Sequence, residues 1–202
     1  MLTATKNTLK GLSKWMARST AFCALAATLF SAAAASAYKL EDWNWKYQAN
    51  PIEARFVICE QDAPSGAASV IKQAAAKWSY SKLKFSFEAN NCPQERPLNY
   101  VEFVPLNVTG LTTAPNELGT HNTKRCLIQF NKSKPWYAGT GMPGGNQNDL
   151  FSVALHEFGH CIGLLDIDDK GAVMNGKLDV GKVLRDLASD DLAGRNAIYG
   201  MP

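Results

Sequence analysis

The sequence lacks three features that would each point to a particular class of protein. Residues 38–202 contain no cluster of basic residues, the cysteines include no C-x-x-C pair, and no apolar run is as long as a membrane-spanning helix. A nucleic-acid-binding protein carries a basic patch or stripe, cysteine-based zinc clusters use closely spaced cysteine pairs, and a spanning helix needs ~20 mostly apolar residues. We therefore expect no nucleic-acid partner, no cysteine zinc cluster and no stable membrane anchor.

The N-terminal residues 1–37 have the organisation of a secretory signal peptide. Four basic residues precede an apolar segment at 21–35, and residues 35–37 are Ala-Ser-Ala, the small-x-small pattern that signal peptidase cuts. An uncleaved anchor is the alternative, but the segment is short and rich in alanine instead of leucine. We expect cleavage near Ala37, a mature domain over residues 38–202, and a secreted or periplasmic location.

Removal of this segment changes the sign of the net charge. The whole chain has 21 Lys+Arg and 18 Asp+Glu, which gives a formal net charge of +3. Four of the basic residues and none of the acidic ones lie in residues 1–37, so 17 basic residues face 18 acidic ones in the remainder, a net charge of −1. The basic character of the full chain therefore comes largely from the signal segment.

The mature chain keeps an even set of cysteines, namely Cys59, Cys92, Cys126 and Cys161. An oxidising compartment favours pairing them as disulfides. Such a set can be connected in several ways, and the sequence does not select one. Our expectation is a disulfide between Cys59 and Cys92 and another between Cys126 and Cys161.

Four segments are predicted to be strands, because bulky or β-branched side chains dominate or alternate in them. These segments are residues 53–59, 85–87, 100–106 and 126–130. The sequence shows no internal repeat, so the strands are expected to belong to one domain.

Three helices are predicted around these strands. The first spans residues 65–79, with Ser65 as its N-cap and apolar side chains at helical spacing. The glycine-rich segment 137–148 is predicted to be a loop, and Asn148 is expected to cap the second helix. The last helix begins at Ser189, with acidic residues in its first turn.

The second helix contains the sequence His-Glu-Phe-Gly-His at residues 156–160. On a helix, His156 and His160 lie one turn apart on the same face, so both can bind one metal ion. Glu157 lies beside them, within reach of a water on the open position of that ion, as a general base requires. The alternative is a solvated helix face, which is a poor match for a protein with only three histidines.

The residues after this motif predict how a third ligand reaches the metal. Gly163 tolerates the positive φ with which a chain turns back at the end of a helix. Asp166 follows shortly after it and is expected to be the third ligand. Two other interpretations of Asp166 remain open: a solvated acid beside Asp168 and Asp169, or a calcium ligand.

The pattern H-E-x-x-H-x-x-G-x-x-D, followed by Met174 in a short segment flanked by glycines, resembles the metzincin clan and, within it, the catalytic domains of matrixins. The C-terminal segment 187–200 and the lead-in at residues 149–151 are also similar to matrixin sequences. The resemblance implies an α+β, metzincin-like fold: a twisted, mostly parallel sheet of four to five strands with an antiparallel edge strand, an active-site helix and a C-terminal helix.

One residue departs from the pattern of most metzincins. Their third ligand is a histidine, whereas this chain has Asp166, as in the small bacterial snapalysin-type proteases. Zinc accepts a carboxylate oxygen, so a set of His156, His160 and Asp166 is chemically sound for peptide hydrolysis.

The resemblance also implies a function. We expect a secreted, monomeric zinc endopeptidase with one catalytic Zn²⁺, with Glu157 as its catalytic base, and with a protein or peptide substrate bound along an edge strand, for which residues 126–130 are the expected strand. Calcium is left open as a further ion, because matrixin relatives often use it to hold surface loops. Two other functions remain open, an inactive secreted zinc-binding interaction module and a zinc amidase acting on a non-protein amide. An open cleft under an edge strand would favour proteolysis over an amidase.

Overall fold

The structure is a computed structural model, and it describes residues 37–46, 51–88, 92, 99–115 and 117–202. The predicted signal segment lies outside the described residues, except for Ala37. The described residues belong to one compact unit of the chain.

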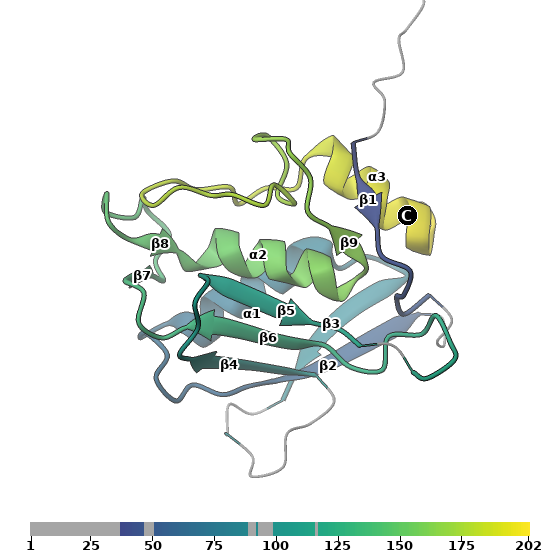
Figure 1. Ribbon diagram of the computed structural model, residues 1–202, viewed down its shortest axis with the longest axis horizontal. Coiled ribbons are helices and arrows are strands. Elements are labelled where there is room, and N and C mark those ends of the chain that lie inside the picture. Colours follow the sequence, from purple (N-terminus) through teal and green to yellow (C-terminus); the bar gives the residue numbers. More distant parts are fainter. Residues whose placement is uncertain (1–36, 47–50, 89–91, 93–98, 116) are drawn as a thin grey trace, which may run out of the picture. The chain divides into compact units, whose positions relative to one another are not determined.

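A five-stranded sheet in the order β3-β2-β4-β6-β5 forms the centre of this unit (Figure 1). Its strands are β2 (Ile52–Ile58), β3 (Leu83–Phe87), β4 (Tyr100–Val104), β5 (Gly110–Thr113) and β6 (Leu127–Asn131). Strands β3, β2, β4 and β6 are parallel to their neighbours, and β5 is antiparallel to β6. The expected α+β fold, with a mostly parallel sheet and an antiparallel edge strand, is confirmed.

The prediction that residues 126–130 form the edge strand is wrong. This segment is β6, which lies between β4 and β5 and pairs with both. The antiparallel edge strand is β5, and β3 is the edge strand on the other side of the sheet. The sequence did not reveal β5 because it is only four residues long and begins with Gly110. Glycine is depleted in strands, and so short a segment carries too little alternation to be recognised.

Among the described residues, three helices accompany the sheet: α1 (Ala67–Trp78), α2 (Leu150–Cys161) and α3 (Ser189–Tyr199). All three were predicted, but two of their N-caps were not. Gly66, in the left-handed conformation, precedes α1 in place of Ser65. Asp149 caps α2 in place of Asn148, and its carboxylate accepts a hydrogen bond from the backbone of Ser152.

Two pairs of short strands extend this architecture. Strand β1 (Lys39–Leu40) pairs antiparallel with β9 (Leu164–Leu165), just beyond α2. Strand β7 (Trp136–Tyr137) pairs in parallel with β8 (Asn148–Asp149), just before α2. Both ends of α2 are therefore held by backbone pairing.

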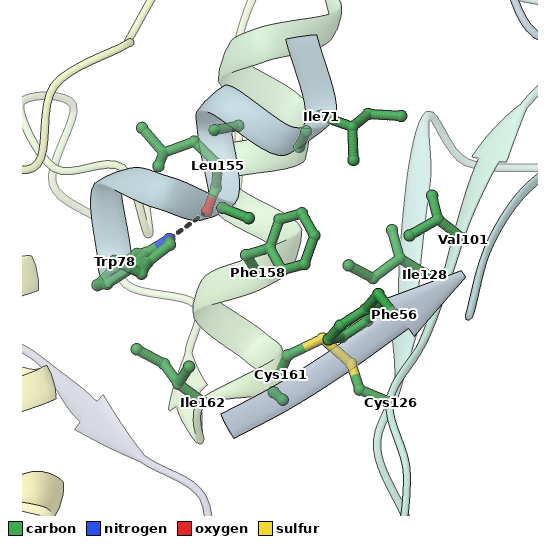
Figure 2. Close-up of a cluster of buried hydrophobic side chains, with 14 of the residues drawn as sticks. Phe56, Ile71, Trp78, Val101, Cys126, Ile128, Leu155, Phe158, Cys161 and Ile162 are labelled. Atoms are coloured by element: carbon green, nitrogen blue, oxygen red, sulfur yellow. Dashed lines mark hydrogen bonds between the residues drawn. A yellow bond between two sulfur atoms is a disulfide. The ribbon is translucent and has the colours of Figure 1, made fainter. Parts of the chain in front are cut away.

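The hydrophobic core lies between the sheet and helices α1 and α2. Phe158 of α2 packs edge-on against Phe56 of β2, with ring centroids 5.3 Å apart, and both rings are fully buried (Figure 2). Trp78 of α1 donates from its indole nitrogen to the backbone oxygen of Leu155, at 2.8 Å. These contacts fix the rotation of α2, so the face opposite Phe158 is directed away from the core.

Both predicted disulfides are present, Cys59–Cys92 and Cys126–Cys161. The second bond joins the start of β6 to the last residue of α2, directly after His160. It therefore ties the C-terminal end of the motif helix to the strand next to β5.

Within the described part of the chain, no helix combines the length and the apolar character needed to cross a bilayer.

Candidate metal centre

The motif helix α2 presents His156 and His160 on one face, while its opposite face is buried. Leu155, Phe158 and Cys161 are fully buried, whereas both histidines are only partly buried. The imidazole rings lie 4.7 Å apart at their centroids and are perpendicular to each other. This arrangement follows from the helical spacing and from the packing that sets the rotation of α2.

Three side-chain atoms from His156, His160 and Asp166 converge on one point. The two Nε2 atoms are 3.1 Å apart, and Oδ1 of Asp166 lies 3.2 Å from Nε2 of His156 and 3.4 Å from Nε2 of His160. Nitrogen and oxygen ligands of a tetrahedral zinc ion, each ~2.0–2.1 Å from the metal, lie about 3.3–3.4 Å from one another. The triangle therefore has the size that zinc coordination requires, and this group of His, Cys, Asp and Glu side chains is the one such candidate among the described residues.

The outer ring nitrogens decide which tautomer the two histidines adopt. Nδ1 of His156 lies 2.8 Å from the backbone oxygen of Val173, and Nδ1 of His160 lies 2.7 Å from that of Leu164. A carbonyl oxygen only accepts, so each Nδ1 carries a proton, and in the neutral, metal-binding form of each ring the lone pair of Nε2 is directed inward. Two lone pairs and a carboxylate oxygen thus face one another, an arrangement that a cation at their centre stabilises.

Burial and neighbouring charges shift the pKa values of the ionisable groups in this site. Burial lowers the pKa of His156, but the hydrogen bond to Asp166 and the nearby carboxylate of Glu157 outweigh it, so the net pKa is raised. The hydrogen bonds with His156 and then His160 hold the pKa of Asp166 well below its usual value. Asp166 is therefore ionised at neutral pH and supplies the negative charge of the site.

Asp166 reaches this position through the turn that ends α2. Gly163 has a φ of 100°, and a Cβ there would lie 3.0 Å from the backbone oxygen of Trp43. The chain then forms β9 and places Asp166 opposite the histidines. The next residue, Ile167, bonds to the backbone of Met174, with Ile167 N donating to Met174 O at 2.9 Å. The predicted glycine turn is thus present, and it is anchored on both sides.

The segment around Met174 lies beneath the site as a buried support. Met174 is 2% exposed, and its sulfur fills the space in which a side chain at Gly159 would have to fit. The backbone nitrogens of Val173 and Met174 both donate to the carboxylate of Asp191 in α3, at 2.9 Å and 3.1 Å. Since the carbonyl of Val173 also orients His156, α3 stabilises the metal centre through this segment.

Glu157 lies beside the histidines and is only 5% exposed. Its Oε2 accepts a hydrogen bond from the hydroxyl of Thr112, at 2.6 Å, and its Oε1 lies close to Gly110. Both contacts come from β5, the strand that the sequence did not predict. Nothing in the local sequence marks Thr112 as a partner, because it is 45 residues from Glu157.

A cleft of about 930 Å³ passes over these groups. It is lined by residues 108–112 and 175–179, and also by Lys39, Glu41 and Trp43. Burial raises the pKa of Glu41, and the charge of His160 opposes that shift. The cleft is open to solvent.

An ion pair that the sequence did not predict holds the entrance of α2. Arg185 donates from Nε to Oδ2 of Asp149 at 2.9 Å, and a second, very short contact joins its terminal nitrogen to Oδ1. The guanidinium also donates to the backbone oxygens of Thr140, at 2.7 Å, and Gly139, at 3.2 Å. Arg185 thereby ties the glycine-rich loop to the N-terminus of α2. Arg185 and Asp149 are too far apart in the sequence for this contact to be predicted from it.

The sequence is similar to those of known proteins. The sequence model of the matrixin family matches residues 45–200. Matrix metalloproteinase-16 from Rattus norvegicus, Homo sapiens and Mus musculus is 39% identical to the chain over 74 residues, which cover 36% of this chain and 12% of each relative. The match thus spans only about 12% of the length of these relatives. The chain belongs to the matrixin family, a family of zinc metallopeptidases.

Proposed function

We propose that this protein is an exported, zinc-dependent endopeptidase that hydrolyses peptide bonds in proteins or peptides. The observation that carries the proposal is the triangle of 3.1, 3.2 and 3.4 Å formed by the inward atoms of His156, His160 and Asp166. Membership of the matrixin family supports the same activity. Export is supported by the sequence of residues 1–37 and by two disulfides.

His156, His160 and Asp166 are the proposed zinc ligands. Two imidazoles and one carboxylate leave the fourth position of a tetrahedral ion open, as catalytic zinc sites require. A zinc ion held by these three residues would polarise the attacking water and the substrate carbonyl. Asp166 lowers the net charge of the loaded site to +1 where a third histidine would leave +2, so more of the proton abstraction rests on the protein base.

Glu157 is the proposed base. It accepts a proton from the attacking water while the water oxygen bonds to the carbon of the scissile carbonyl. When the carbon–nitrogen bond breaks, Glu157 returns the proton to the departing amine nitrogen, which regenerates the carboxylate. Because Glu157 is almost fully buried, bulk water has little access to it except through the cleft.

The substrate is proposed to lie along β5, which replaces residues 126–130 in this role. One side of β5 pairs with β6, and its other side has no strand neighbour among the described residues. An extended peptide can add to such an edge through main-chain hydrogen bonds. Residues 175–179 line the same cleft and are the proposed source of side-chain preference. We propose that the protein acts as a monomer.

The other two functions predict different behaviour. A zinc amidase for small molecules would be expected to enclose its substrate, and the cleft here is bordered by an edge strand instead. An inactive interaction module has no need of a base, yet Glu157 is retained in the H-E-x-x-H motif. Calcium stays a prediction, to be tested by whether the zinc-loaded protein gains thermal stability on its addition.

Cleavage of a peptide library by the chain from Tyr38 to Pro202 tests the proposal. Wild type should bind one zinc ion and cleave, whereas Glu157→Gln should keep the zinc and lose roughly 100- to 10,000-fold in kcat. Glu53→Gln, on an exposed position of β2, is the matched control and should behave as wild type. Cleavage by Glu157→Gln at the wild-type rate would contradict the assignment of the base. A wild-type protein that binds zinc but cuts no peptide would favour the interaction module, and one that cuts only small amides would favour the amidase.

A further inference from the structure

We infer that Thr112 is a positioning residue for Glu157, so that the edge strand which receives the substrate also sets the orientation of the base. The inference rests on the proposed function and extends it to a residue outside the metal-binding motif. It is carried by the contact between β5 and α2, which lie side by side (Figure 1).

The hydroxyl of Thr112 is committed to the carboxylate. Oγ1 lies 2.6 Å from Oε2 of Glu157 and 3.1 Å from the backbone oxygen of the same residue. A hydroxyl has one proton to donate, and a separation of 2.6 Å lies within the range of charge-assisted bonds from a hydroxyl to a carboxylate. The proton is therefore directed to Oε2, and the contact with the backbone oxygen is secondary.

The other carboxylate oxygen is placed by the same strand. Oε1 lies so close to Gly110 that a Cβ on that residue would collide with it. Gly110 and Thr112 are two positions apart in β5, so both are directed to the same face of the strand. One residue makes room for Oε1 and the other bonds Oε2, and together they fix the plane of the carboxylate.

This orientation matters because a general base works only at hydrogen-bonding distance from the proton that it removes. A glutamate side chain has several rotatable bonds, so a buried carboxylate without a fixed partner would occupy more than one orientation. The bond to Thr112 restricts Glu157 to one of them. If the Thr112 hydroxyl served only to hold β5 against α2, its removal would lower folding stability without changing the orientation of the carboxylate.

Kinetics of zinc-loaded protein test this role. Thr112→Val removes the hydroxyl at nearly constant volume and should lower kcat roughly tenfold. This loss is smaller than the 100- to 10,000-fold loss expected when a general base itself is removed. KM should stay within about twofold, because β5 is proposed to bind the substrate through its main chain, which the substitution leaves in place, and zinc content should be unchanged. Thr112→Ser, which restores the hydroxyl, should recover most of the lost kcat. Thr120→Val, at an exposed threonine outside the cleft, is the matched control and should leave kcat unchanged.

Crystal structures of zinc-loaded wild type, Thr112→Val and Thr112→Ala give a readout that does not depend on activity. The wild-type carboxylate should bond Thr112, and in both variants it should rotate or occupy several positions. A carboxylate in the wild-type position in the variants overturns the inference, whatever the rates. If wild type cleaves no peptide, the proposed function fails on its own, and the carboxylate position still decides the role of Thr112.

Discussion

The sulfur of Met174 lies against Gly159, in the space that a side chain at position 159 would need. Gly159 is the fourth residue of the H-E-x-x-H motif, where the pattern itself permits any residue. A Cβ at this position would also lie 3.1 Å from Cζ2 of Trp78, so the helix is closely packed on two sides. The glycine therefore permits close contact between α2 and the support under the metal centre.

We predict that Gly159→Ala destabilises the fold even though alanine favours helices. Overpacking in a filled core costs about 1–3 kcal/mol, which exceeds the gain in helix propensity of about 1 kcal/mol. Chemical denaturation of the zinc-free protein measures the change. Gly145→Ala is the control, because a Cβ there meets nothing within 4 Å. If both variants unfold at the same denaturant concentration, the proposed close packing is wrong.

Arg185 is predicted to stabilise the N-terminus of the motif helix. Its partner Asp149 is 1% exposed, so Arg185→Gln leaves a buried carboxylate without its cation. Removing one member of such a pair costs roughly 3–5 kcal/mol. Lys132→Gln breaks an exposed pair with Asp62 and should cost less than about 1 kcal/mol. Urea unfolding compares the two, and equal losses would argue against a special role for Arg185.

Zinc affinity is predicted to fall as the pH is lowered through the neutral range. Metal binding requires neutral histidines and an ionised carboxylate. Because the pKa of His156 is raised above 6.5, protons compete with zinc at this ligand already above that pH. The pKa of Asp166 is lowered, so this residue stays ionised and does not limit binding over the same range.

A competition titration with a chromogenic chelator, from about pH 8 to about pH 6, measures this dependence. The dissociation constant should rise steadily as the pH falls, after correction for the protonation of the chelator. A constant value over the whole range would show that no histidine is a ligand.

The sequence predicted the parts of the site that depend on local spacing. His156 and His160 lie together because they are one helical turn apart, and Asp166 returns to them because Gly163 permits a sharp turn. Those relationships involve few residues and one backbone geometry each, so they can be recognised without knowing the fold.

The contacts that orient the site depend on tertiary structure and were not predicted. Thr112 meets Glu157 only because β5 adds to the edge of the sheet beside α2, and Arg185 meets Asp149 across 36 residues. The true edge strand was missed because it is short and begins with glycine, so the substrate path was assigned to the neighbouring strand. Local periodicity identifies a strand, but the order of strands in the sheet depends on how the whole chain packs.

Two histidines and one aspartate are proposed to bind a single zinc ion. The zinc affinity of Asp166 variants tests this ligand set most directly. The dissociation constant for zinc should rise by at least about tenfold in Asp166→Ala. Even residues that only hydrogen-bond to zinc ligands change zinc affinity by about 10- to 100-fold when they are mutated. Asp168→Ala, at an exposed acid two residues away, should bind as wild type does. Wild-type affinity in Asp166→Ala would contradict the claim and show that the third ligand lies elsewhere.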